Sequence, residues 1–173
     1  DDYEPGATAE SIGAMFGRMR PRLVALREAV LAKTPPAALV GRFGEAAQLR
    51  LSRDLALAFG YDFSRGRIDL AVHPFSSGSA SDSRITTRVV ESDPFNCIYS
   101  TIHEVGHSSY ELAIDPDYAM TPIGHGCSMG VHESQSRIYE NQIGRSRAFT
   151  GWMFAQMRDR FGAFDMPNAE AFY

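Results

Sequence analysis

Five residues near the middle of the chain have the types and spacing of a metal-dependent hydrolytic site. The segment His103-Glu104-Val105-Gly106-His107 has the form H-E-x-x-H. Residues four apart lie on one face of a helix, so the two imidazoles can converge on one zinc ion. Zinc lowers the pKa of water towards neutrality, and the glutamate between the histidines can take up the released proton. The pattern therefore predicts a zinc site with Glu104 as general base.

The residues around this motif predict the helix that such a site needs. Residues 92–94 (Ser-Asp-Pro) are typical of a helix start, with Pro94 near the first turn. Ile98, Ile102 and Val105 can pack against a core while the histidine face stays free. This context favours metal binding over the alternative, a helix that carries two histidines by chance.

A catalytic zinc site commonly has three protein ligands, and four downstream residues are candidates for the third. Glu111 lies one turn beyond the second histidine, about 6 Å further along the axis, so we expect a residue beside the site or at the surface and not a ligand. The position of His125, in a loop between two glycines, cannot be argued from the sequence, and we expect a pocket residue. Glu133 reaches the metal if its helix packs antiparallel to the first, although it could instead be an exposed acid at a helix start. Glu140, two turns later, suits a hydrogen bond to a ligand or to Arg137.

Hydrophobic periodicity predicts a mainly α-helical fold with a small β-sheet. Residues 1–60 carry two helical stripes, the pattern of a helical hairpin, and Pro21 should kink or interrupt the first helix. Residues 67–90 predict two strands around a polar loop, because apolar and β-branched residues alternate or cluster there. Residues 94–160 predict the zinc-site helices, the last of them continuous from about 128 to 160.

Composition and charge exclude several functional classes. The 173 residues are 44% hydrophobic and 22% charged, which is typical of one soluble domain. A net charge of −4 without Lys/Arg clusters argues against nucleic acid, and no apolar run is long enough to span a membrane. The start of the chain does not resemble a secretory signal, so we expect a cytoplasmic protein. Cys97 and Cys127 are isolated, and we expect buried, reduced thiols.

Four motifs in order make the sequence resemble the Taq-type thermostable metallocarboxypeptidases, a family of HEXXH zinc enzymes. They are HPF at residues 73–75, DxRxT at 82–86, HEVGH at 103–107 and HESQS at 132–136. A lone HEXXH occurs in many peptidases, whereas HPF followed by DxRxT is a signature of this family. The resemblance spans most of the chain.

The resemblance implies a function, a fold and a set of site residues. His103, His107 and Glu133 bind zinc, for which cobalt is a possible substitute, and Glu104 is general base and acid. The fold is a helical, gluzincin-like zinc peptidase with a small sheet beside the groove. Family members form homodimers, act on peptides with a free C-terminal carboxylate and are considerably longer. We therefore expect residues 1–173 to be one central segment of a longer carboxypeptidase.

The roles of four further residues stay open. Arg84 could bind a substrate carboxylate or pair with Asp82 and shape its loop. His73 could stabilise an oxyanion or serve as a turn residue, and His132 and His125 are candidate pocket residues.

Two other functions remain possible. The segment could be a truncated domain that binds metal without turnover. The same zinc chemistry could also serve an endopeptidase or an aminopeptidase.

Overall fold

The computed structural model describes residues 4–79 and 81–173, which fall into two compact units. The first unit, residues 1–38, contains the long helix α1 (Ala9–Leu31), whose residues are all exposed. Thr8 caps α1 reciprocally with Ser11, and the helix continues through Pro21, which therefore does not interrupt it. Because α1 and the next helix belong to different units, their pairing as a hairpin stays a prediction.

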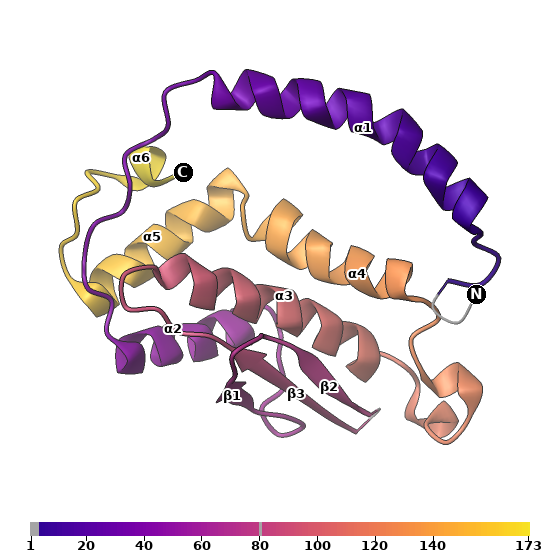
Figure 1. Cartoon of the computed structure of the whole chain (residues 1–173). Helices are drawn as coiled ribbons and strands as arrows, with labels where there is room; N and C mark the ends of the chain where they lie inside the picture. The colour runs from indigo at the N-terminus through magenta and orange to yellow at the C-terminus, as the bar shows by residue number, and fades with distance from the viewer. Residues whose placement is uncertain (1–3, 80) are drawn as a thin grey trace. The chain divides into compact units, whose positions relative to one another are not determined.

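The second unit, residues 39–173, contains a small sheet and the remaining helices (Figure 1). Helix α2 (Glu45–Ala58) is followed by the strands β1 (Ile68–Leu70), β2 (Ser76–Ser79) and β3 (Asp82–Thr87). The strand order is β1-β3-β2, with β1 parallel and β2 antiparallel to β3.

Strand β2 corrects the sequence prediction, which placed a loop there between two strands. Its residues, Ser-Ser-Gly-Ser, have little intrinsic preference for a strand. Pairing with β3 decides their conformation, from Ser76 opposite Ile85 to Ser79 opposite Asp82. Gly78 permits this close pairing, because a Cβ there would lie 2.0 Å from the carbonyl oxygen of Asp82.

Helix α3 (Pro94–Leu112) carries the HEVGH motif and lies at the centre of this unit. It begins as predicted, with Asp93 as the N-cap and Pro94 in the first turn. Helix α3 packs against α2 and β3. Its residues Ile98 and Ile102 join one buried core with Phe43, Leu51, Leu55, Met153 and Met157, and Val105 joins a second with Ala56, Tyr61 and Ile85. Helix α3 is therefore held on several sides at once.

The helical region after the loop is not continuous, so the prediction for residues 128–160 was wrong in this respect. Two short 3₁₀ turns, Pro116–Tyr118 and Pro122–Gly124, lead to α4 (Met129–Arg137). A π-helical turn, Ile138–Ile143, follows directly, and then come α5 (Arg147–Phe161) and α6 (Ala169–Phe172). The break before α5 reflects Gly144, a weak helix former, and Ser146, which caps α5 by accepting a hydrogen bond from Phe149 N–H.

The two cysteines differ in burial. Cys97 is fully buried, as predicted, and lies 3.0 Å from the Ser52 hydroxyl. The prediction for Cys127 was wrong, since it is exposed in the connection that precedes α4. None of the described helices combines the length and apolarity needed to cross a membrane.

Helices α3 and α4 run antiparallel and in contact (Figure 1). They pack tightly at Gly106, inside the HEVGH motif. A Cβ built on Gly106 would lie 2.7 Å from Cα of Ser136 and 3.3 Å from the carbonyl oxygen of Gln135. Both contacts are with backbone atoms, which cannot move away by a change of rotamer as side-chain atoms can. Only glycine therefore allows α4 to lie this close to α3.

Gly106→Ala should push α4 away from α3 and lower the free energy of unfolding by about 1–3 kcal/mol, the usual cost of overpacking. Urea unfolding of the complete protein measures this change. Gly151→Ala is the matched control, because Gly151 lies within α5 and a Cβ there meets no atom within 4 Å. The control should be stabilised by about 0.5–1 kcal/mol. Equal stabilisation by both substitutions would contradict the close contact.

Candidate metal centre

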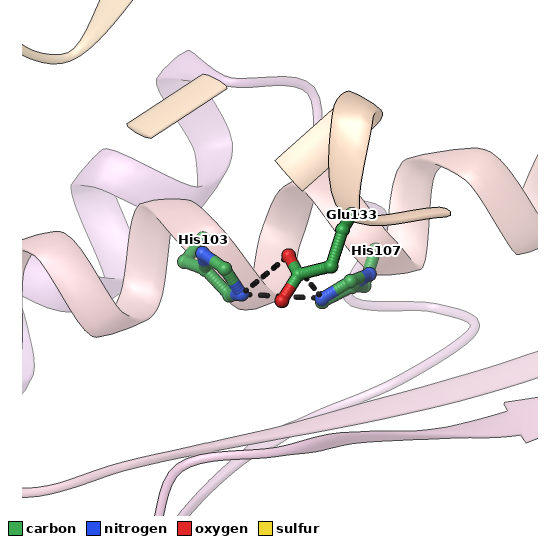
Figure 2. Close-up of side chains that lie close together, drawn as sticks. All are labelled: His103, His107 and Glu133. Atoms are coloured by element: carbon green, nitrogen blue, oxygen red, sulfur yellow. Dashed lines mark hydrogen bonds and ion pairs between the residues drawn. The ribbon is translucent and has the colours of Figure 1, made fainter. Parts of the chain in front are cut away.

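Two ligand candidates on α3 and one on α4 lie together in the structure (Figure 2). Nε2 of His103 and Nε2 of His107 are 3.1 Å apart. Oε2 of Glu133 lies 3.4 Å from the first and 3.6 Å from the second. A tetrahedral zinc ion with ligands at about 2.0–2.1 Å separates its donor atoms by about 3.3 Å. The spacing of these atoms therefore matches a tetrahedral metal site.

The second ring nitrogen of His103, Nδ1, is hydrogen-bonded to Glu140, in the π-helical turn after α4. Nδ1 of His103 lies 3.0 Å from Oε2 of Glu140. Since a carboxylate only accepts hydrogen bonds, we assign the imidazole proton to Nδ1, which leaves the lone pair on Nε2. Arg137 and Arg145 each donate to Glu140 at 3.0 Å. Glu140 thus has the role expected for it, a hydrogen bond to a candidate ligand and to Arg137.

The second ring nitrogen of His107, Nδ1, is hydrogen-bonded to another histidine, His132. Nε2 of His132 lies 2.7 Å from Oε1 of Glu111, so this nitrogen donates to the carboxylate. Nδ1 of His132 is then an acceptor, and it lies 2.6 Å from Nδ1 of His107. We therefore assign the proton of His107 to Nδ1 and the lone pair to Nε2.

With these protons assigned, the three inner atoms are all acceptors. No proton is left to bridge the Nε2 atoms of His103 and His107 or to join them to Glu133. Three lone pairs facing one another at this distance repel, and a cation among them removes the repulsion. Two nitrogens and one carboxylate oxygen form a donor set that suits zinc. The residues present therefore fit the predicted metal.

The protonation of these groups agrees with the assignment. Burial, together with the neighbouring histidines, lowers the pKa of His107 to about 4, so its imidazole is neutral at neutral pH. Burial by itself would raise the pKa of Glu133. The hydrogen bond from Ser136 and the nearby charges outweigh that effect, so the net pKa is lowered and the side chain is ionised.

Ser136, which the sequence reasoning did not single out, orients Glu133. Its hydroxyl donates to Oε2, the same oxygen that faces the two histidines. Ser136 is fully buried and lies one turn after Glu133 in α4, where it also meets Gly106. The serine that ends HESQS, three residues after a candidate ligand, is the signal that could have indicated this contact.

Glu104 lies beside these donors and is only 6% exposed. Burial raises its pKa to about 7, and the negative charges of Glu133 and Glu140 contribute in the same direction. A carboxyl group with a pKa near neutrality can both accept and return a proton at physiological pH. This environment suits the general base and acid that the sequence predicts.

Two cavities, of about 870 and 520 Å³, meet at the site and share Pro74, His103 and Glu104 in their walls. Aromatic residues and two arginines line the larger one, including Phe95, Tyr99, Phe172, Arg137 and Arg145. Strand β2 and the loop before α4 line the smaller one, together with His107 and Glu133. A ligand that crosses from one cavity to the other passes Glu104.

The four candidate pocket residues differ in where they lie in the structure. His125 and His132 line the smaller cavity. Arg84 is exposed and donates to Asp82 at 2.8 Å, which favours its loop-shaping alternative. His73 is also exposed, and the walls of the two cavities include its neighbour Pro74 instead.

The HPF and DxRxT motifs contact each other through hydrogen bonds between Phe75 and Thr86. Thr86 accepts from Phe75 N–H at 2.8 Å through its hydroxyl and donates its own N–H to the Phe75 carbonyl at 2.9 Å. This contact fixes the segment that places Pro74 in both cavities.

Comparison with known proteins adds to this geometry. The family model of the carboxypeptidase Taq (M32) metallopeptidases matches residues 1–173. The chain belongs to this family. The M32 family is therefore the one that the four sequence motifs indicated, and its metallopeptidase chemistry implies a divalent metal.

Individual relatives agree with the M32 assignment. Thermostable carboxypeptidase 1 of Thermus thermophilus is 38% identical over all of this chain, which covers 35% of that protein. The M32 carboxypeptidase of Deinococcus radiodurans R1 is 46% identical with a TM-score of 0.89, over 92% of this chain and 33% of that one. Trypanosoma cruzi metallocarboxypeptidase 1 is 32% identical with a TM-score of 0.87, over 99% of this chain and 35% of that one. The chain thus spans about a third of the length of these relatives.

Glu133→Ala should lower zinc affinity by more than about 100-fold, because losing a ligand costs more than losing a group that supports one. Zinc per chain after dialysis, measured by atomic absorption on the complete protein, checks this. Ser134→Ala, at an exposed neighbour on α4, is the control and should keep full zinc content. Unchanged zinc in Glu133→Ala would refute the third ligand.

Proposed function

We propose that the protein containing this segment is a zinc-dependent carboxypeptidase that hydrolyses the C-terminal peptide bond of peptides. The observation that carries this proposal is the convergence of His103, His107 and Glu133 at tetrahedral spacing beside the buried Glu104. Membership of the M32 family and the names of its relatives support the reaction class. Since the chain spans about a third of those relatives, the activity is proposed for the whole protein.

The three inner donor atoms would hold the metal. Bound zinc would act as a Lewis acid that polarises the scissile carbonyl and lowers the pKa of the attacking water. Cobalt(II) accepts the same donors and is a possible substitute. The hydrogen bonds to Glu140 and His132 hold the imidazole protons on Nδ1, with the Nε2 lone pairs directed inward.

Glu104 would transfer a proton from the attacking water to the leaving amine. Its carboxylate accepts a proton from the attacking water and later returns it to the leaving amine. A pKa near neutrality suits both steps, and burial of the carboxyl group excludes competing water.

The two cavities support an exopeptidase. Cleavage at the C-terminus needs one hollow for the terminal residue and another for the rest of the peptide, with the base between them. The guanidinium groups of Arg137 and Arg145 line the larger cavity, beside the carboxyl groups of Glu104 and Glu140. A guanidinium group suits a free C-terminal carboxylate, so these two arginines are candidates to bind it.

An inactive metal-binding segment and an endopeptidase or aminopeptidase are the alternatives. The complete set of ligands and base favours turnover in the whole protein over metal binding alone. A homodimer and a cytoplasmic location stay predictions from the resemblance and from the sequence.

Glu104→Gln in the complete protein should lower kcat by at least about 100-fold, the lower range for losing a general base. Peptide hydrolysis at saturating substrate measures this, and zinc per chain should equal that of the wild type. Turnover within a few fold of wild type, with zinc retained, would overturn the role of Glu104.

A peptide with a free C-terminal carboxylate should be cleaved by the complete protein at least about 100-fold faster than its C-terminal amide, because the amide lacks the charge to be recognised. Mass spectrometry of the products identifies the bond that is cut. Comparable cleavage of both peptides at an internal bond would establish an endopeptidase instead.

A further inference from the structure

We propose that His132 and Glu111 form a positioning pair that fixes the tautomer and ring orientation of His107, so that its Nε2 lone pair faces the metal. This inference rests on the proposed zinc site and adds a role to residues outside the ligand set. His132 and Glu111 are positioning residues, because they act through His107.

The pair connects the two helices that carry the candidate ligands. Glu111 lies on α3, one turn after His107, and His132 lies on α4, directly before Glu133. The hydrogen bonds of 2.7 Å and 2.6 Å run from Glu111 through His132 to His107. These two hydrogen bonds therefore join α3 to α4 and orient His107 beside Glu133.

The environment holds the His132 ring in place. The rings of Tyr110 and His132 form a T-shaped pair, with a centroid distance of 4.8 Å and an interplanar angle of 80°. A Cβ on Gly126 would lie 2.8 Å from Cδ2 of His132, 3.0 Å from Tyr110 and 3.2 Å from Glu111. The loop backbone thus closes over the pair with no room for a side chain, and His132 and Glu111 are about four-fifths buried.

The tautomer of His107 decides whether it can bind a metal. A neutral imidazole carries its proton on either nitrogen, and a proton on Nε2 blocks coordination. An acceptor fixed at Nδ1 selects the productive form, and Glu111 makes His132 that acceptor by accepting a hydrogen bond from its Nε2–H, which leaves the lone pair on Nδ1. For His103, Glu140 does the same directly. Metal ligands held in this way commonly lose 10- to 100-fold in affinity when the partner is removed.

Two amide substitutions at His132 separate the two halves of the pair. The amide oxygen of His132→Asn lies near the position of Nδ1 and can still accept from His107. The longer amide of His132→Gln reaches the position of Nε2, where it can donate to Glu111 but leaves Nδ1 of His107 without its acceptor. Both variants remove one imidazole and leave the net charge of neutral histidine unchanged.

The test is zinc affinity of the complete protein, measured by competition with a chromophoric chelator, together with the visible absorption spectrum of the cobalt(II) form. We expect His132→Gln to bind zinc about 10- to 100-fold more weakly and to alter the cobalt spectrum. His132→Asn should recover most of the affinity and the wild-type spectrum. Glu111→Ala should weaken zinc binding, and Glu111→Gln, which keeps an acceptor oxygen, should do so less. Asp117→Asn, at an exposed acid in the 3₁₀ turn Pro116–Tyr118, is the control for the loss of one negative charge.

The outcomes distinguish this inference from the proposed function. Wild-type zinc affinity and cobalt spectrum in both His132→Gln and Glu111→Ala would overturn the pair and leave the metal site standing. Equal losses of zinc affinity in His132→Asn and His132→Gln, with equal losses of thermal stability in the metal-free protein, would show that His132 contributes packing alone. That result would also overturn the positioning pair. A wild-type protein that binds no zinc would overturn the proposed function together with this inference. If His132→Gln does not fold, the two Glu111 variants decide.

Discussion

The close approach of α3 and α4 is the constraint on which the metal centre depends. At Gly106 the two backbones come so near that a single methyl group would collide with Ser136. This approach lets Glu133, on α4, reach the two histidines of α3 with a side chain whose Oε2 is only four bonds from Cα. A shift of α4 by the width of a methyl group would move Oε2 of Glu133 away from the two histidine nitrogens, which now lie 3.4 and 3.6 Å from it.

The electrostatics of the site follow from this packing. The Nε2 atoms of the two histidines and Oε2 of Glu133 face one another, while the Nδ1–H groups of the histidines point away from this centre. Glu140 and the His132–Glu111 pair draw the imidazole protons outward, while Ser136 steers the oxygen of Glu133 inward. Gathering acceptors without donors is unfavourable unless a cation joins them, so the supporting residues prepare the site for a metal. The same negative charges contribute to the raised pKa of Glu104.

The sheet contributes to the site by position. Thr86 of β3 holds the backbone of Phe75, and Pro74 next to it forms a wall of both cavities. Strand β2 then continues along the smaller cavity. Two motifs that looked like candidates for chemistry, HPF and DxRxT, here contact each other and shape the groove. Arg84, paired with Asp82 at the surface, belongs to this framework.

The sequence by itself determined the parts of this protein that depend on local spacing. The i, i+4 histidines, the Asp-Pro start of their helix and the mainly helical fold class could all be read from residues close together in the chain. The motifs also indicated the M32 family. Only the tertiary structure decided what depends on contacts between distant segments. Strand β2 forms because β3 pairs with it, and Gly106 matters because Ser136 lies against it. His132 meets Glu111 across 21 residues, and no local periodicity encodes such a contact, because helix packing brings the two together.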